Sequence, residues 1–241
     1  MNGFGFAGAF PDALIVALLC VEAVLALIAL ISLARKHLLQ RYKSLAVILA
    51  LMFLANAFGL VIRYVPLSHL FYKSYFYSYW LTEAVELILM LVFCSEVLKR
   101  MFSSLPELQS LSMRIFRWVL ILGIALSAVL VFLMRWDGPR LLAAEVIQLQ
   151  RLEEFVAFFT AVVVFASMRT LGFEPRTRLF GFSLGLVFSV LSVGPTFLAD
   201  EVRMKHPQSI AILVSVAICA QLVSWIAALS WPEPVRHVVS V

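Results

Sequence analysis

Seven apolar runs of about twenty residues each recur along the chain, separated by short polar links such as RKHLLQRYK, RWDGPR and GFEPRTR. Backbone groups in lipid have no water to bind, so runs of this length must form helices that satisfy their own hydrogen bonds. Composition agrees, because 63% of the 241 residues are hydrophobic and only 14% are charged. A soluble domain carries roughly 25% charged residues. The sequence therefore predicts an all-α membrane protein.

We expect a bundle of seven transmembrane helices that forms a single domain over residues 1–241, because none of the links could hold a folded domain. The fifth span is the weakest prediction, since its uninterrupted apolar part covers only residues 155–168. If this segment only dipped into the membrane, the last two spans would turn over. The expected spans cover residues 13–34, 44–62, 75–98, 116–134, 151–170, 179–199 and 210–231.

The distribution of Lys and Arg orients the bundle, since cytoplasmic loops carry the excess of positive charge. Twelve such residues fall in the first, third and fifth links and the C-terminal tail: Arg35, Lys36, Arg41, Lys43, Lys99, Arg100, Arg114, Arg117, Arg169, Arg176, Arg178 and Arg236. Six fall on the opposite side: Arg63, Lys73, Arg135, Arg140, Arg203 and Lys205. We therefore expect the N-terminus outside and the C-terminus in the cytoplasm.

The expected location is the bacterial inner (plasma) membrane, with a multi-pass topology. Residues 1–10 contain no Lys or Arg, which the n-region of a signal peptide would carry. We therefore expect the first apolar run to be retained as a span.

Polar side chains inside the expected spans share one depth. An ionisable side chain in the middle of a membrane helix costs about 2.5–3.5 kcal/mol, so each one calls for a partner or a function. With a helical rise of about 1.5 Å per residue, five polar residues lie about 18–22 Å from the inner edge of their spans. These are Glu22, Asn56, Glu86, Glu154 and Ser192. The common level lies just outward of the middle of the bilayer.

This level predicts a polar pocket for a ligand or ion in the outer half of the bundle. Glu83 and Glu86 are three residues apart and share a helix face, where they repel unless one is protonated or a cation lies nearby. Arg151 is the strong cation expected at that depth. The predicted lining consists of Arg63, Glu83, Glu86, Arg151 and Glu154, with Glu22 and Asn56 at the floor.

Arg151 has two interpretations. Its guanidinium extends to the outer interface while its aliphatic stem stays in the membrane. Alternatively, it pairs with Glu83 or Glu86, or with Glu154 one turn along its own helix.

Glu22 also has two interpretations. It is either a protonated carboxyl group hydrogen-bonded to Asn56 on the next span, or a group that titrates protons or coordinates a cation. Near the outer end of the fifth span, Glu145 and Gln148 are expected to be solvated, because that end extends beyond the lipid.

Two features of the last spans predict helix packing. The segment GFSLG, residues 181–185, formally matches a nucleophile elbow, but it lies inside an apolar run and no His lies within any span. Gly181 and Gly185 instead match the small-xxx-small pattern that lets two helices approach closely. Gln221 and Ser224 in the seventh span are expected to form hydrogen bonds between helices.

We expect no enzymatic activity, no cofactor and no metal site, because no nucleophile, metal cluster or phosphate loop is found. Haem and di-iron sites need His inside the bundle, and the four histidines lie in links or the tail: His37, His69, His206 and His237. The net charge of +5 is explained by the basic residues that flank the spans. It therefore predicts no nucleic-acid partner.

The runs YWLTEAVELILMLVFCSEVLKRMF, QLQRLEEFVAFFTAVVVFASMRTLGF and RLFGFSLGLVF resemble a group of uncharacterised seven-helix membrane proteins of bacteria, of the acidobacterial type. More remotely, the layout resembles the seven-helix sensor modules that precede histidine kinase or cyclase domains in bacterial receptors. The sensor modules carry an output domain after their last span, and none is expected here. The resemblance implies a seven-helix fold.

Three functional hypotheses follow. The first is a receptor-like or accessory bundle that binds a small ligand or protons in the polar pocket and signals through a separate cytoplasmic or membrane partner. The second is a transporter of a small solute coupled to protons or cations. The third is a structural subunit of a membrane complex. All three have the lipid bilayer as their surroundings, and the sequence predicts no oligomeric state.

Overall fold

The structure is a computed structural model that describes residues 13–64, 69–103, 105–133, 139–171, 177–202 and 207–232. Within these residues it contains seven α-helices and no strand. The helices are α1 (Ala13–Arg35), α2 (Lys43–Tyr64), α3 (His69–Met101), α4 (Pro106–Leu133), α5 (Pro139–Leu171), α6 (Arg178–Val202) and α7 (Pro207–Ser230).

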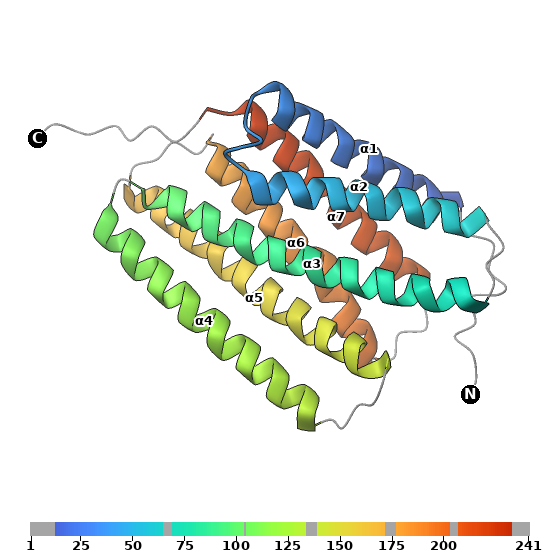
Figure 1. Cartoon of the computed structure of the whole chain (residues 1–241). Helices are drawn as coiled ribbons and strands as arrows, with labels where there is room; N and C mark the ends of the chain where they lie inside the picture. Colours follow the sequence, from blue (N-terminus) through green and yellow to red (C-terminus); the bar gives the residue numbers. More distant parts are fainter. Residues whose placement is uncertain are drawn as a thin grey trace, which may run out of the picture.

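Successive helices run antiparallel, so the Arg35 end of α1 and the Ser230 end of α7 lie at the same end of the bundle (Figure 1). Helix α1 packs against both α2 and α7, while α5 packs against α3 and α6. Contacts of α2 with α3 and of α6 with α7 join these two groups. Among the described residues, α4 contacts only α3 and α5, so it lies at the edge of the bundle.

Three helices begin with proline, namely α4 at Pro106, α5 at Pro139 and α7 at Pro207. Proline suits the first helical position, because its missing N–H would have no partner there and its φ is already helical. Helices α4 and α5 begin ten and twelve residues before their expected spans at 116 and 151. Polar helical turns therefore precede the apolar runs in both helices.

Four helices are long and apolar enough to cross a membrane, through the segments Val16–Arg35, Lys43–Val61, Pro106–Leu126 and Ile212–Ser230. The described residues of α6 provide a shorter apolar segment, Arg178–Leu191. Helices α3 and α5 each carry several charged residues along their length. Within the described residues, the expectation of an all-helical chain with several helices fit to span a membrane is confirmed.

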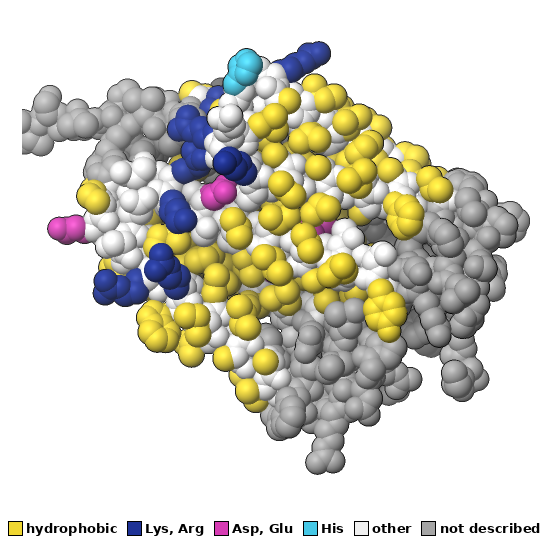
Figure 2. Space-filling view, viewed as in Figure 1, with side chains coloured by type: hydrophobic (Ala, Val, Ile, Leu, Met, Phe, Trp, Pro, Cys, Tyr) yellow, Lys and Arg dark blue, Asp and Glu magenta, His cyan; other side chains and the backbone are white. Residues whose placement is uncertain are grey.

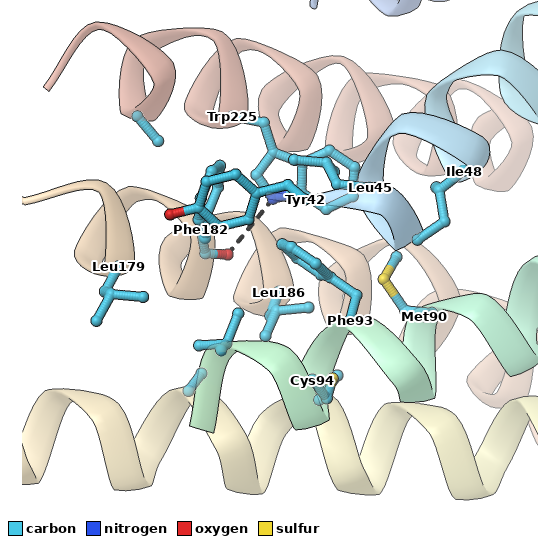
Figure 3. Packing of buried hydrophobic residues seen from close by; sticks show 14 of the residues in the cluster. Tyr42, Leu45, Ile48, Met90, Phe93, Cys94, Leu179, Phe182, Leu186 and Trp225 are labelled. Atoms are coloured by element: carbon cyan, nitrogen blue, oxygen red, sulfur yellow. Dashed lines mark hydrogen bonds between the residues drawn. The ribbon is translucent and has the colours of Figure 1, made fainter. Parts of the chain in front are cut away.

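Four aromatic side chains join the link between α1 and α2 to α3, α6 and α7 in the core (Figure 3). The ring centroid of Phe182 lies 5.1 Å from that of Tyr42 and 5.6 Å from that of Phe93. The ring of Phe93 lies 5.7 Å from that of Trp225, and all three pairs meet edge to face, the arrangement that the ring quadrupoles favour. This aromatic cluster fixes the α6–α7 pair against the rest of the bundle.

Helices α6 and α7 approach each other closely at two glycines. A Cβ atom added at Gly181 would lie 2.5 Å from the Cβ of Ala228, and one added at Gly185 would lie 2.1 Å from the Nε1 of Trp225. Ser224 donates a hydrogen bond of 2.8 Å to the carbonyl of Gly181 across the same contact. The predicted packing role of GFSLG and the interhelical bond of Ser224 are therefore both confirmed.

Basic side chains gather at one end of the bundle (Figure 2). We call this the basic end; its described members are Arg35, Lys36, Arg41, Lys43, Lys99, Arg100, Arg114, Arg117 and Arg178. Two of them donate side-chain hydrogen bonds to backbone carbonyl groups. Lys36 Nζ donates to the carbonyl of Leu229 at 2.6 Å, and Arg100 donates to the carbonyl of Arg41. Such bonds satisfy carbonyls at helix ends and in the first link, and cations there complement the helix dipoles.

Candidate functional site

Four glutamates from two helices form the largest group of acidic side chains in the interior of the described part of the bundle. Glu83 and Glu86 come from α3, and Glu153 and Glu154 come from α5, which packs directly against α3. Glu153 is only 3% exposed and Glu154 only 9%, whereas Glu83 and Glu86 are half-buried. We call these residues the α3–α5 carboxyl cluster.

Electrostatic interactions tie the cluster together around Glu153. Its carboxyl group interacts with those of Glu154, Glu86 and Glu83, and Glu83 also acts on Glu86. The fully buried Cys94 of α3 lies within the same electrostatic range of Glu153. Charges of one sign repel strongly in apolar surroundings, where little water screens them. The cluster therefore gains stability from any proton or cation that offsets the charge.

Two carboxyl oxygens of the cluster are buried without a hydrogen-bond partner, Oε1 of Glu153 and Oε1 of Glu154. Buried polar atoms normally find a partner, and an isolated one costs about 1–3 kcal/mol. A proton, a cation or a donor group on a ligand would satisfy these oxygens. The geometry thus leaves acceptor capacity inside the bundle that the described side chains do not use.

Arg151 lies one turn from Glu154 on α5 and interacts electrostatically with it. The side chain of Arg151 is exposed. Glu154, one of the acidic partners expected for Arg151, therefore lies within reach of the guanidinium group. Its exposure also agrees with a guanidinium that extends toward the outer end of the helix.

Glu22 belongs to a different part of the bundle, where α1 meets α2 and α7. It is 3% exposed, and Asn56 Nδ2 donates to its Oε2 over 3.4 Å. The hydrogen bond predicted between Glu22 and Asn56 is therefore present. Ser215 of α7 also forms a side-chain hydrogen bond with Glu22. No acid of α3 or α5 is among the described groups that act on Glu22, so the structure presents two acidic sites rather than one.

Of the remaining polar residues considered in the sequence, three have side chains outside the described part of the structure. Arg63 lies in α2 and Ser192 lies in α6, but the side chains of both, and that of Glu145, lie outside the described part of the chain. Gln148 was expected to be solvated, and this was wrong, because its side chain is only 8% exposed. The cause is the long α5 helix, which carries Gln148 along the interior of the bundle well before the apolar run begins.

Two members of these sites were not predicted from the sequence, Glu153 and Ser215. Glu153 stands beside Glu154 and at almost the same depth, but its rotation about the helix axis is not fixed by depth alone. Ser215 could have been found, because it precedes Ser230 by fifteen residues, which is about 22 Å along a helix. The depth estimate that selected Glu22 and Asn56 applies equally to Ser215.

The described residues contain no group of three or more His, Cys, Asp or Glu side chains arranged to hold a metal ion. Comparison with family models, with curated proteins and with solved structures finds no match to this chain. The class of protein that the structure defines is thus a helical protein with at least four helices fit to cross a membrane. Its function must be argued from its own residues.

Proposed function

We propose that the chain is a receptor-like membrane bundle whose α3–α5 carboxyl cluster binds protons and which signals through a separate partner. The observation that carries the proposal is Glu153, which is almost fully buried, has an unpartnered oxygen and interacts with three other carboxyl groups. When a proton neutralises Glu153, its repulsion from Glu83 and Glu86 on α3 disappears. Binding would therefore shift the packing of α3 against α5.

In this proposal all seven helices cross the membrane, and α3 and α5 do so by turning their acids inward. Val85, Ile88 and Val92 form an exposed apolar stripe on α3, with the spacing of one helix face. On α5, Phe155, Phe158 and Val162 are exposed in the same way, whereas Glu153 is buried. Membrane helices place ionisable residues toward the bundle interior, because a charged side chain in contact with lipid is costly.

The basic end lies in the cytoplasm of the bacterial cell in this proposal, following the excess of Lys and Arg in cytoplasmic loops. Figure 2 supports this arrangement, since Lys and Arg gather at one end and hydrophobic side chains cover the face beyond them. The N-terminus would then lie outside and the C-terminus inside. A partner that reads the bundle would meet the basic end, and it would need an acidic or phosphate-bearing surface.

Infrared difference spectroscopy of the protein in lipid vesicles tests the cluster directly. Between acid and alkaline pH we expect a carboxyl C=O band that Glu153→Gln removes, because the substitution takes away the central carboxyl group. Glu107→Gln is the matched control, since Glu107 lies exposed in the first turn of α4. The control variant should keep the band. If Glu153→Gln leaves the difference spectrum of the wild type unchanged, the cluster does not bind protons.

The partner is tested by affinity purification in mild detergent at both pH values. We expect one cytoplasmic or membrane protein to be recovered with the wild type and with Glu107→Gln in a pH-dependent manner. Glu153→Gln should bind it equally at both pH values. Recovery of no specific partner in any of these samples would contradict the receptor-like part of the proposal.

A second candidate function is a small-solute transporter coupled to protons or cations. It is favoured by the presence of two buried acidic sites on different helices, Glu22 on α1 and Glu153 on α5, which could serve as successive carriers. This alternative predicts uptake into proteoliposomes that depends on a pH gradient and is lost in Glu22→Gln. Uptake that persists without the gradient would exclude it.

A further inference from the structure

We propose that Glu22, Asn56 and Ser215 form a site for a monovalent alkali cation, with Na⁺ as the probe, at the junction of α1, α2 and α7. Helix α1 packs against both α2 and α7 in the structure, and the three side chains meet there through hydrogen bonds to Glu22. The site is separate from the α3–α5 carboxyl cluster. The inference therefore does not depend on the proposed function.

The carboxyl group of Glu22 is poorly satisfied where it lies. Its side chain is almost fully buried, yet Oε1 has no hydrogen-bond partner. The bond from Asn56 Nδ2 to Oε2 measures 3.4 Å, which is long compared with the usual length of about 2.9–3.0 Å. Ser215 adds one further bond. A carboxylate can accept about four hydrogen bonds or metal contacts, so the buried group keeps unused acceptor capacity.

The side chains around Glu22 supply the ligand type that an alkali cation prefers. Hard cations bind oxygen from carboxylate, carbonyl and hydroxyl groups. Glu22 offers two oxygens and Ser215 offers one, while rotation of the Asn56 amide presents its carbonyl oxygen in place of its nitrogen. Cys219, one turn beyond Ser215 on α7, also interacts with Glu22, but sulfur is a soft ligand. Four oxygens from three helices would therefore surround the ion.

The charge of the site selects a monovalent ion. Glu22 is the one carboxyl group among the described groups at this junction; Asn56, Ser215 and the thiol of Cys219 interact with it. One negative charge balances one positive charge, so the occupied site is neutral. A neutral site is what burial in an apolar bundle favours, because an uncompensated charge there is costly.

Site-resolved labelling of the wild type tests this inference. A hydrophobic carbodiimide reacts with carboxyl groups in apolar surroundings, and mass spectrometry assigns the adduct to Glu22 or to Glu153. Na⁺ at about ten times its Kd is expected to slow the labelling of Glu22 about tenfold, since the free site is depleted by that factor. Choline chloride at the same ionic strength should have no effect. If Glu22 is labelled and Na⁺ does not slow its labelling, the site is overturned.

Thermal unfolding of the purified full chain gives a second readout, which decides the matter if the carbodiimide does not reach Glu22. Replacing choline by saturating Na⁺ should raise the Tm of the wild type by about 5 °C, because the ion binds only the folded state. The rise should vanish in Glu22→Gln and shrink in Ser215→Ala, which is a small change with little risk to folding. A wild type with equal Tm values in both salts would refute the proposal.

Glu153→Gln is the matched control, because it removes a buried acid from the other site. This variant is expected to keep the Na⁺-dependent rise in Tm. If Glu153→Gln loses the rise and Ser215→Ala keeps it, Na⁺ binds at the α3–α5 carboxyl cluster and the assignment to Glu22 is wrong. Failure of the Na⁺ site would leave the infrared behaviour of Glu153 untouched, so the two proposals fail separately.

Discussion

At the scale of single residues, His37 shows how the sequence ends one helix and begins the next. It follows α1 with a φ of 54°, in the left-handed region where glycine is usual. The amide of Leu38 donates to the carbonyl of Leu33 at 3.0 Å, and the amide of His37 donates to that of Ala34 at 3.0 Å. This pair of bonds is a Schellman motif. Its two leucines, Leu33 and Leu38, are both buried in the hydrophobic core.

Replacing His37 by glycine should stabilise the protein, because glycine adopts the left-handed conformation without a steric cost from Cβ. We expect the free energy of unfolding to rise by about 0.5–1 kcal/mol, measured by denaturant titration in bicelles. His37→Ala is the control, since alanine removes the imidazole but keeps the Cβ. Equal effects of the two substitutions would show that the backbone conformation is not the cause.

At the scale of helices, the contact between α6 and α7 depends on the absence of side chains at Gly181 and Gly185. The opposing atoms belong to Ala228 and to the indole of Trp225, which is held in the aromatic cluster and donates a hydrogen bond of 3.4 Å to the carbonyl of Phe182. Backbone atoms and an enclosed indole cannot move aside as a flexible side chain would. The two helices must therefore separate if either glycine gains a Cβ.

Gly185→Ala is accordingly expected to lower the free energy of unfolding by about 1–3 kcal/mol, as overpacking of a close helix contact does. Gly59→Ala is the matched control, because Gly59 lies inside α2 with no atom within 4 Å of an added Cβ. There alanine should be neutral or stabilising by up to about 1 kcal/mol, through its higher helix propensity. Comparable destabilisation by both variants would contradict the packing account.

The helices also show how far the sequence could predict the site. Depth follows from counting residues along a helix, and it correctly brought Glu22 level with Asn56, whose side chains meet. Rotation about the helix axis does not follow from counting, so Glu154 was selected where its neighbour Glu153 is the one that interacts with Glu83 and Glu86. A membrane helix is apolar on all sides, because lipid and neighbouring helices both contact apolar side chains. The sequence pattern therefore does not identify the face that packs inward. The positions at which α4 and α5 begin, ahead of their apolar runs, could have been predicted from Pro106 and Pro139.

At the scale of the whole molecule, apolar side chains cover much of the described surface, and five acids lie buried or half-buried inside, namely Glu22, Glu83, Glu86, Glu153 and Glu154. Most of the other described charged groups gather at the basic end (Figure 2), where Arg100 stacks over the ring of Tyr42 at 4.2 Å. Helix α4 at the edge of the bundle exposes Trp118, Leu122 and Leu126, as a helix that faces lipid would. This distribution of side chains supports the proposed seven-span topology.

The proposed topology predicts the side of the membrane on which each end of the chain lies. A fluorescent protein fused to the C-terminus should fluoresce in bacterial cells, whereas alkaline phosphatase at the same place should be inactive, because the basic end faces the cytoplasm. Alkaline phosphatase fused after Lys205, in the link between α6 and α7, should be active. The reverse pattern at both places would contradict the proposed topology.

The central claim is that the carboxyl groups of α3 and α5 act on one another inside the bundle, and a double-mutant cycle between Glu86 and Glu153 measures this most directly. The free energy of unfolding would be determined in bicelles at alkaline pH, where both carboxyl groups have lost their protons, for the wild type, Glu86→Gln, Glu153→Gln and the double variant. Because one repulsion is relieved by either substitution, we expect the two effects to be non-additive by about 1–3 kcal/mol. Effects that add to within about 0.5 kcal/mol would show that the two carboxyl groups do not interact, and the account of the site would be wrong.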